Sequence, residues 1–162
     1  MNYLLYKEVY NQNKSLDQLF INAYGNSNEI ITKNKLELLV ELGELANESK
    51  CFKYWSKKSP DKNLVLEEYA DCLLMIFYFM REFDIELNET FPNTDNNNII
   101  DQFLVLYKLT SNLLNQYTKE LIKEIFVQMI NLGKLLNLSD KEIIASCFNK
   151  IKIDKQRFEI DY

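Results

Sequence analysis

Residues that interrupt helices are scarce in this chain. Its 162 residues include only three glycines, Gly25, Gly43 and Gly133, and two prolines, Pro60 and Pro92. A β-rich fold of this length would normally need more turn residues between its strands. The long segments between these positions are rich in Leu, Ile, Lys and Glu, and few interruptions in such segments favour helices. The sequence therefore predicts an all-α fold.

Apolar residues recur at helical spacing in six stretches, which polar segments separate. The helices predicted from this spacing cover residues 3–22, 29–53, 64–84, 99–115, 117–136 and 140–150. Ser139 and Glu142 form a capping box that would open the last of them, and residues 151–162 alternate charged and aliphatic side chains. Because no repeat or second core pattern is present, we expect a single domain over residues 1–162, built as a bundle of about five to six helices.

Net charge, cysteines and apolar runs limit the partners and the location. The formal net charge is −5, which argues against duplex nucleic acid, because binding it usually needs a basic surface. Cys51, Cys72 and Cys147 are odd in number and form no CxxC pair, so we expect the reducing environment of the cytoplasm. The longest apolar run, residues 72–80, is too short to span a bilayer. No secretion signal is visible at the N-terminus, so we expect no membrane partner.

The sequence contains no histidine. This absence excludes catalytic triads that use histidine, zinc sites with histidine ligands, and the most usual general base. Candidate ligands and bases must therefore be sought among the carboxylates.

Acidic residues occur inside a predicted helix that otherwise looks buried. In the segment VELGELANES, residues 40–49, Glu41, Glu44 and Glu48 follow one another at steps of three and four. These steps bring the three carboxylates to one side of a helix. Gly43 lies between two of them, where it costs about 1 kcal/mol relative to alanine, so we expect another helix or a ligand to approach closely there.

The next predicted helix repeats this arrangement. Glu68 and Asp71 are three residues apart and directly precede the apolar run at 72–80, whereas Glu67 points about 100° away and is expected to be solvated. If the two helices pack antiparallel across the loop at residues 56–63, both acid pairs can face one cleft.

Four neighbouring carboxylates in a poorly solvated cleft would repel one another, and a divalent cation removes that cost. Ligands that are all oxygen suit a hard metal, so Mg²⁺ is expected first, Mn²⁺ second and Ca²⁺ third. Mg²⁺ usually also binds substrate phosphates, which indicates phosphate chemistry. Either acid pair alone more often forms a solvated helix face. Periodicity alone favours neither interpretation of the acids, a solvated helix face or a metal site, over the other.

The residues around these acids resemble a known family. ExxE followed by ExxD a couple of dozen residues later is the signature of the MazG-like all-α NTP pyrophosphohydrolases. The longer segment LLVELGELANESKCFKYWSKK...LEEYADCLLMI, residues 38–76, is similar to the dimeric (type II) all-α dUTPases of that superfamily. NKSLDQL, residues 13–19, and CFNKIKIDKQRFEIDY, residues 147–162, resemble further segments of the same family.

The resemblance implies a helical homodimer with a MazG-like four-helix core. It also implies hydrolysis of dUTP, and often dUDP, to dUMP, which keeps uracil out of DNA. Glu41, Glu44, Glu68 and Asp71 would hold Mg²⁺, with Mn²⁺ as the alternative. One of the first two would also be the base for the attacking water; we favour Glu44, and the sequence alone leaves Glu41 open.

Substrate contacts follow from the same resemblance. Lys53, Lys150 and Arg157 would meet the phosphates, for which permanently charged side chains are suited. Trp55 would help to form the uracil pocket, with core packing as its alternative role. Glu48 would support the metal ligands or contact the sugar.

Several positions depart from the family pattern near the substrate. Asn13 takes the place of a glutamine near the base. Asp154 replaces an asparagine of the C-terminal segment, which removes a donor and adds charge near the nucleotide. Phe158 and Asp161 replace a glutamine and a glycine, and Leu74 replaces a histidine. These changes leave the expected metal chemistry intact and the selectivity for uracil open.

Two other functions are therefore alternatives. The first is a pyrophosphohydrolase for another (deoxy)nucleoside triphosphate, such as dCTP or a nucleotide with a damaged base. The second is a non-catalytic helical module that dimerises or binds a partner protein. A panel of nucleotides separates the first from dUTP hydrolysis, and Mg²⁺-dependent release of pyrophosphate separates the second.

Overall fold

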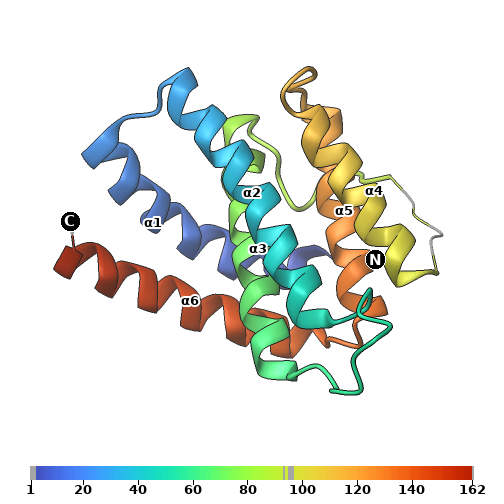
Figure 1. Ribbon diagram of the computed structural model, residues 1–162. Coiled ribbons are helices and arrows are strands. Elements are labelled where there is room, and N and C mark those ends of the chain that lie inside the picture. Colours follow the sequence, from blue (N-terminus) through green and yellow to red (C-terminus); the bar gives the residue numbers. More distant parts are fainter. Residues whose placement is uncertain (1–2, 93, 95–96, 162) are drawn as a thin grey trace.

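The computed structural model describes residues 3–92, 94 and 97–161 and shows a bundle of α-helices (Figure 1). The elements are η1 (Tyr3–Tyr6), α1 (Lys7–Tyr24), α2 (Asn28–Ser49), α3 (Lys62–Glu82), α4 (Ile99–Asn112), α5 (Lys119–Leu135) and α6 (Asp140–Asp161). These described ranges contain no strand, which confirms the predicted all-α fold. Within them, no helix combines the length and the apolar character that crossing a membrane requires.

Polar side chains mark where the helices begin. One side chain before each of α2, α3, α4 and α5 accepts a hydrogen bond from a backbone N–H of the first turn: Ser27, Asp61, Asn98 and Thr118. At α6 the predicted capping box is formed, because Ser139 Oγ accepts from the Glu142 N–H and Glu142 Oε2 accepts from the Ser139 N–H. Such caps satisfy N–H groups that have no partner inside the helix.

α2 ends earlier than the sequence predicted. The expected helix reached residue 53, whereas α2 ends at Ser49 because Lys50 adopts the left-handed conformation, with φ at 54°. The Lys50 ammonium then donates to the carbonyl of Ser59 across 2.8 Å. This contact ties together the two ends of the connection between α2 and α3.

α6 is longer than predicted. The apolar spacing predicted a helix over 140–150, but the helix continues to Asp161. Its last turns run along α1, where Phe158 packs against Phe20 with ring centroids 5.1 Å apart. Lys155 of the same segment donates to Ser15 Oγ across 2.7 Å. Tertiary packing on α1 therefore stabilises turns that local spacing does not predict.

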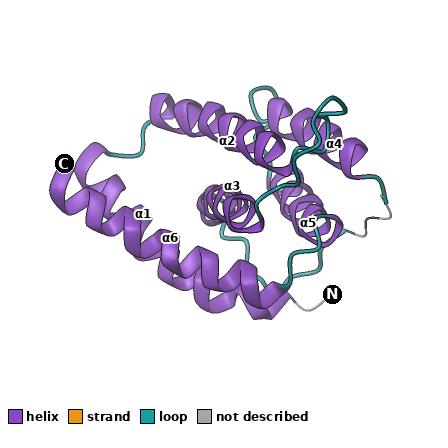
Figure 2. Ribbon diagram, turned by 60° about the horizontal axis from the view of Figure 1, so that its bottom comes forward, coloured by secondary structure: helices purple, strands orange, loops and turns teal. Residues whose placement is uncertain are grey.

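α3 is the central helix, with the other helices arranged around it (Figure 2). It packs against α1, α2, α5 and α6, while α4 contacts α2 and α5. The helices α2, α3, α5 and α4 thus form a closed ring of neighbours, which corresponds to the expected four-helix core. The apolar run at 72–80 supplies the centre of this core, and eight of its nine residues are buried.

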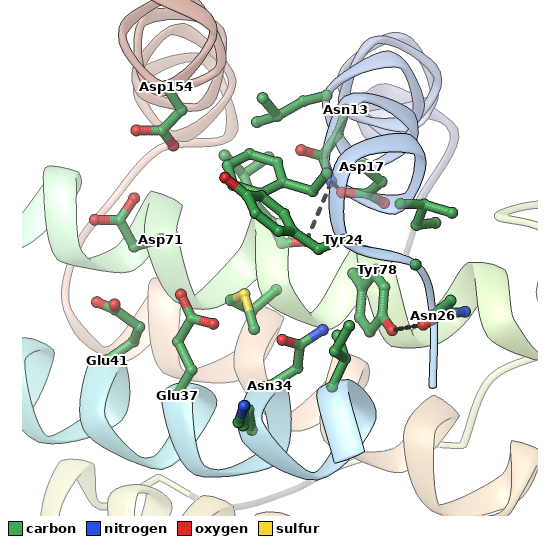
Figure 3. A pocket seen from close by; sticks show the side chains of 18 of the residues that line it. Asn13, Asp17, Tyr24, Asn26, Asn34, Glu37, Glu41, Asp71, Tyr78 and Asp154 are labelled. Atoms are coloured by element: carbon green, nitrogen blue, oxygen red, sulfur yellow. Dashed lines mark hydrogen bonds between the residues drawn. The ribbon is translucent and has the colours of Figure 1, made fainter. Parts of the chain in front are cut away.

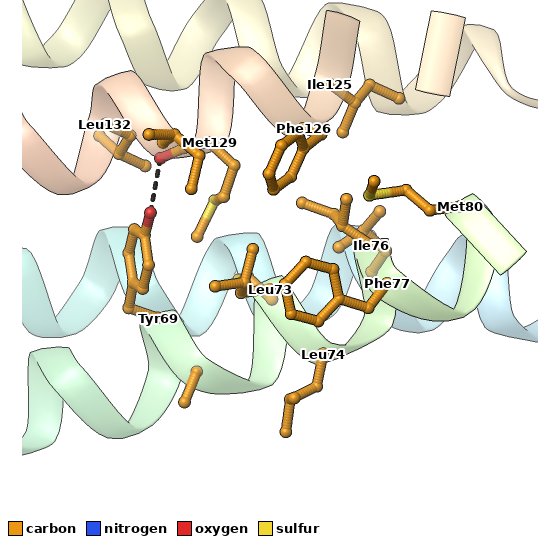
Figure 4. Packing of buried hydrophobic residues seen from close by; sticks show 14 of the residues in the cluster. Tyr69, Leu73, Leu74, Ile76, Phe77, Met80, Ile125, Phe126, Met129 and Leu132 are labelled. Carbon is orange, nitrogen blue, oxygen red and sulfur yellow. Dashed lines mark hydrogen bonds between the residues drawn. The ribbon is translucent and has the colours of Figure 1, made fainter. Parts of the chain in front are cut away.

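The contact between α3 and α5 depends on a glycine. The hydroxyl of Tyr69 donates to the carbonyl of Met129 across 2.8 Å (Figure 4). A Cβ at Gly133 would lie 2.7 Å from that hydroxyl oxygen. Since overpacking a core typically costs about 1–3 kcal/mol, this position requires a residue without a side chain.

Candidate functional site

Three carboxylates from two adjacent helices come together. α2 and α3 run antiparallel side by side (Figure 1). One oxygen from each of Glu41, Glu44 and Glu68 lies within 4.8 Å of the others. Glu67 is exposed on another side of α3, as predicted. The i,i+3 spacings thus bring acids of both predicted pairs into one cluster.

Asp71, the fourth predicted ligand, lies beside this cluster but has another partner. Its Oδ2 accepts a hydrogen bond from the ammonium of Lys150 on α6 across 2.8 Å. The same ammonium lies 3.9 Å from Asp154, which in turn lies 3.7 Å from the guanidinium of Arg157. One predicted metal ligand and one predicted phosphate contact are therefore paired with each other.

Burial and mutual repulsion make these acids hard to ionise. Burial, followed by the charges of Asp71 and Glu44, raises the pKa of Glu41 to about 7. Burial and the charge of Asp71 likewise raise the pKa of Glu68 to about 7. Burial raises the pKa of Asp71 to about 6, although Lys150 opposes the shift. A cation bound beside these carboxylates would stabilise their charged forms.

The donor set fits a hard divalent cation. Oε2 of Glu41 is buried and makes no hydrogen bond within the described residues. An orphaned carboxylate oxygen of this kind is costly, and it is not what a solvated helix face provides. Oxygen ligands in such a cluster suit Mg²⁺ or Mn²⁺. Glu44, in contrast, is exposed.

Gly43 has the close neighbour that its position inside α2 predicted. A Cβ at this position would lie 3.2 Å from the hydroxyl oxygen of Tyr107. The neighbour is a side chain of α4, so of the two expected partners the structure shows another helix.

A cavity of about 900 Å³ opens beside the carboxylate cluster, between α1, α2, α3 and α6 (Figure 3). Its lining includes six of the predicted site residues: Asn13, Glu41, Asp71, Lys150, Asp154 and Arg157. Leu74, which stands where the family pattern has histidine, lines it as well. Glu41, Asp71 and Asp154 lie at one end, and Asn26 and Tyr78 lie toward the other (Figure 3).

Three predicted substrate residues lie outside this lining. Trp55 is 64% exposed on the loop between α2 and α3, where it contacts Phe52 and Tyr54, so it does not pack in the core. The ammonium of Lys53 donates to Asn47 Oδ1 across 2.6 Å. Glu48 accepts a hydrogen bond from the amide of its neighbour Asn47 across 3.1 Å.

The structure adds cavity residues that the sequence reasoning missed. Asn34 and Glu37 precede Glu41 on α2 at steps of three and four and line the cavity beside it. Helical spacing could have identified them. The hydrogen bond from the Tyr78 hydroxyl to Asn26 Oδ1, 2.7 Å long, could not have been predicted, because these two residues are far apart in the chain.

A buried polar chain borders the cavity on the side of α1. Asn13 is buried, and its Nδ2 donates to the carbonyl of Leu74 across 3.2 Å. Asp17 lies one turn later and forms an ion pair with Arg81 of α3. Burial raises the pKa of Asp17 to about 6, although Arg81 opposes the shift.

Comparison with protein-family models finds a match to the model described as dUTPase, over residues 6–162. The match includes every residue of the carboxylate cluster and of the cavity lining named above. A search of curated proteins finds no match.

Proposed function

Because the chain belongs to the dimeric all-α dUTPase family, a family of nucleotide pyrophosphohydrolases, we propose that it hydrolyses dUTP to dUMP and pyrophosphate. The observation that carries this proposal is a cluster of carboxylates at one end of a cavity, in a chain that matches the family over almost its whole length. The reaction would keep uracil out of DNA. We propose dUDP as a second substrate.

Glu41, Glu44 and Glu68 are the proposed ligands of Mg²⁺, with Mn²⁺ as the alternative, and Asp71 is the fourth. When bound, the cation would polarise phosphoryl oxygens and offset the charge of the pyrophosphate that leaves. Asp71 is paired with Lys150 in the chain without ligand. Lys150 bonds only Oδ2, so Asp71 would join the ligand set either through Oδ1 or by exchanging this partner.

The chain's own groups divide the remaining work between them. Glu44 is the proposed general base. Its carboxylate is exposed and would take a proton from the water that hydrolyses the bond between the α- and β-phosphates. Glu41 is less suited to this role because one of its oxygens is buried away from water. Lys150 and Arg157 reach the cavity and would bind phosphate oxygens through charge-assisted hydrogen bonds. Release of pyrophosphate would restore the pairing between Lys150 and Asp71.

Asn13 and Asp154 are the proposed contacts to the pyrimidine of the nucleotide, since both line the cavity. Glu48, Lys53 and Trp55 remain proposed substrate contacts as well. None of the three lines the cavity of its own chain. Contacts by Lys53 and Trp55 need either a movement of the loop between α2 and α3 or a second copy of the chain, and a contact by Glu48, which lies on α2, needs a second copy or a ligand that extends beyond the cavity.

A homodimer is proposed on an exposed apolar surface. The helices α2 and α4 are adjacent, and four large aliphatic side chains are exposed on them: Leu36, Val40, Ile100 and Leu104. We call these four side chains the α2/α4 face. On each helix the two are four residues apart and lie on one side. Exposed apolar patches of this kind are typical of protein interfaces.

Charges beside this face favour a second copy as the occupant. Asp101 and Lys108 are exposed on α4, and Leu104 lies between them. In a twofold dimer with antiparallel α4 helices that cross near Leu104, Asp101 of each copy would lie opposite Lys108 of the other. A twofold interface requires this kind of self-complementary surface.

One observation supports the alternative of dCTP hydrolysis. Asp154 and Glu37 both line the cavity, and a carboxylate accepts hydrogen bonds readily from an amino group such as that of cytosine.

We further propose that residues 1–162 form one domain, because the buried core draws side chains from all six α-helices. A cytoplasmic location is proposed as well, since all three cysteines are free thiols.

The experiment that tests this function is release of pyrophosphate from dUTP, dCTP, dTTP and UTP at equal concentration, with Mg²⁺ and with a chelator. We expect turnover of dUTP to exceed that of the other three and to require the metal. If dCTP is turned over fastest, dCTP replaces dUTP as the proposed substrate. If no nucleotide releases pyrophosphate in a metal-dependent way, the result supports a non-catalytic module.

A further inference from the structure

The amide of Asn13 is held in one orientation by two acceptors. The side chain is only 1% exposed. Its Nδ2 donates to the carbonyl oxygen of Leu74 across 3.2 Å and to Asp17 Oδ1 across 3.4 Å. A carbonyl and an ionised carboxylate can only accept hydrogen bonds, so the atom that faces them must be the nitrogen.

Asp17 is itself held by Arg81. The Arg81 Nε donates to Asp17 Oδ2 across 2.8 Å, and Nη2 of the same guanidinium contacts the same oxygen. Arg81 also donates from Nη1 to the carbonyl of Tyr10 across 3.1 Å and lies over the Tyr10 ring. The guanidinium thus fixes Oδ2 of Asp17, and Oδ1 remains directed at Asn13.

This arrangement leaves one atom of the Asn13 amide for the cavity. Within the described part of the chain, Oδ1 of Asn13 makes no hydrogen bond, and Asn13 is part of the cavity lining. Figure 3 shows Nδ2 directed at the Leu74 carbonyl and Oδ1 on the other side of the amide. The cavity therefore meets a carbonyl oxygen, which is an acceptor without a donor.

We infer that Asp17, held by Arg81, is a positioning residue that fixes the Asn13 amide so that its oxygen faces the base, and that this selects a pyrimidine with an N–H at ring position 3. Uracil has a donor there, whereas cytosine has an acceptor. An acceptor placed against Asn13 Oδ1 would leave both atoms unpaired in a buried site, which is costly. The inference rests on the proposed function in assuming that the cavity holds a pyrimidine nucleotide.

The substitution Asp17→Asn reverses this arrangement in a defined way. Arg81 keeps an oxygen as its partner, so the new NH₂ group takes the place of Oδ1 and opposes Nδ2 of Asn13. Two donors then face each other, and the Asn13 amide loses the reason for its orientation. We expect the preference for uracil over cytosine to fall about 10- to 100-fold, the size of the discrimination that one well-placed amide provides.

The test measures binding of dUMP and dCMP by calorimetry at pH 8 with a chelator present, so that it does not depend on turnover. The wild type should prefer dUMP, and Asp17→Asn should lose most of this preference. Asp84→Asn is the matched control: Asp84 is exposed near Arg81 in a left-handed conformation that asparagine tolerates. This control should keep the preference.

A double-mutant cycle with Asn13→Ala separates positioning from general damage. Asn13→Ala should abolish the preference by itself, and adding Asp17→Asn should then change it no further. If Asp17→Asn does not fold, as judged by thermal unfolding, Arg81→Lys takes its place, since an ammonium lacks the fork that holds Asp17. Unchanged preference in a folded Asp17 or Arg81 variant would overturn the inference, as would a wild type that prefers dCMP or neither nucleotide. A wild type that prefers dUMP but hydrolyses no dUTP would refute the proposed function and leave the inference standing.

Discussion

Lys150 on α6 donates a hydrogen bond to Asp71 on α3 across 2.8 Å, and both residues line the cavity between α1, α2, α3 and α6. The family resemblance implies that Lys150 contacts the phosphates and that Asp71 holds the metal. Because of this pairing, the ammonium of Lys150 already neutralises part of the negative charge that a divalent ion would neutralise. Metal and lysine should therefore compete for Asp71.

This competition can be measured with Lys150→Gln. Removal of the ammonium should tighten Mn²⁺ binding in the absence of nucleotide, because Asp71 becomes available. The same change should lower kcat/KM for dUTP about 10- to 100-fold, since a charged hydrogen bond contributes about 1.5–3 kcal/mol. Calorimetric titration and steady-state kinetics give the two values. Lys152→Gln, an exposed position on the same helix, should change neither, and weaker Mn²⁺ binding by Lys150→Gln would contradict the competition.

Glu44→Gln tests the proposed base. Because Glu44 is exposed, the variant should fold with an unfolding temperature near that of the wild type. Its kcat should fall by about 10²- to 10⁴-fold, the usual contribution of a general base. Glu67→Gln is the matched control, since Glu67 is an exposed glutamate of α3, and it should retain activity. Normal turnover by Glu44→Gln would remove Glu44 from the mechanism.

The raised pKa values predict how stability depends on pH without metal. Burial raises the pKa of Glu41 and of Glu68 to about 7, above the ordinary value of 4.5. Between these values the folded protein binds more protons than the unfolded chain, so the free energy of unfolding should fall as pH rises from about 4.5 to about 7. Chemical denaturation at pH 5 and pH 7.5 with a chelator measures this.

Saturating Mg²⁺ should reduce the difference between the two pH values, because bound metal favours the ionised carboxylates. Glu41→Gln should also reduce the difference in the metal-free protein. A metal-free protein that is more stable at pH 7.5 than at pH 5 would show that these acids are not held in a poorly solvated cluster.

The proposed dimer is tested by Leu104→Glu. A charge at the centre of the α2/α4 face should convert a dimer to a monomer in sedimentation equilibrium. Leu64→Glu, at an exposed leucine on α3, is the control and should leave the dimer intact. Asp101→Lys should weaken the dimer, because two lysines then oppose each other, and Asp101→Lys with Lys108→Asp should restore it. A monomeric wild type, or a dimer that Leu104→Glu leaves unchanged, would exclude this face.

The sequence predicted those features that depend on short spacing. The capping box of Ser139 and Glu142 and the cluster of Glu41, Glu44 and Glu68 follow from steps of three within one or two helices. Even the close approach at Gly43 could be expected, although not that Tyr107 supplies it.

The features that the sequence did not predict depend on residues far apart in the chain. Asp17 and Arg81 are 64 residues apart in the chain, and only the packing of α1 on α3 brings them together. The extension of α6 to Asp161 depends on contacts with α1, such as that of Phe158 with Phe20. Local periodicity contains no information about either contact.

The most direct test of the central claim is a crystal structure with Mn²⁺ and a dUTP analogue whose α–β bridge cannot be hydrolysed. Anomalous scattering locates the metal without reference to the protein. We predict an anomalous peak between the carboxylates of Glu41, Glu44 and Glu68, with the triphosphate beside it and the uracil toward Asn13. A nucleotide bound in the cavity with no metal peak between these three carboxylates would contradict the account.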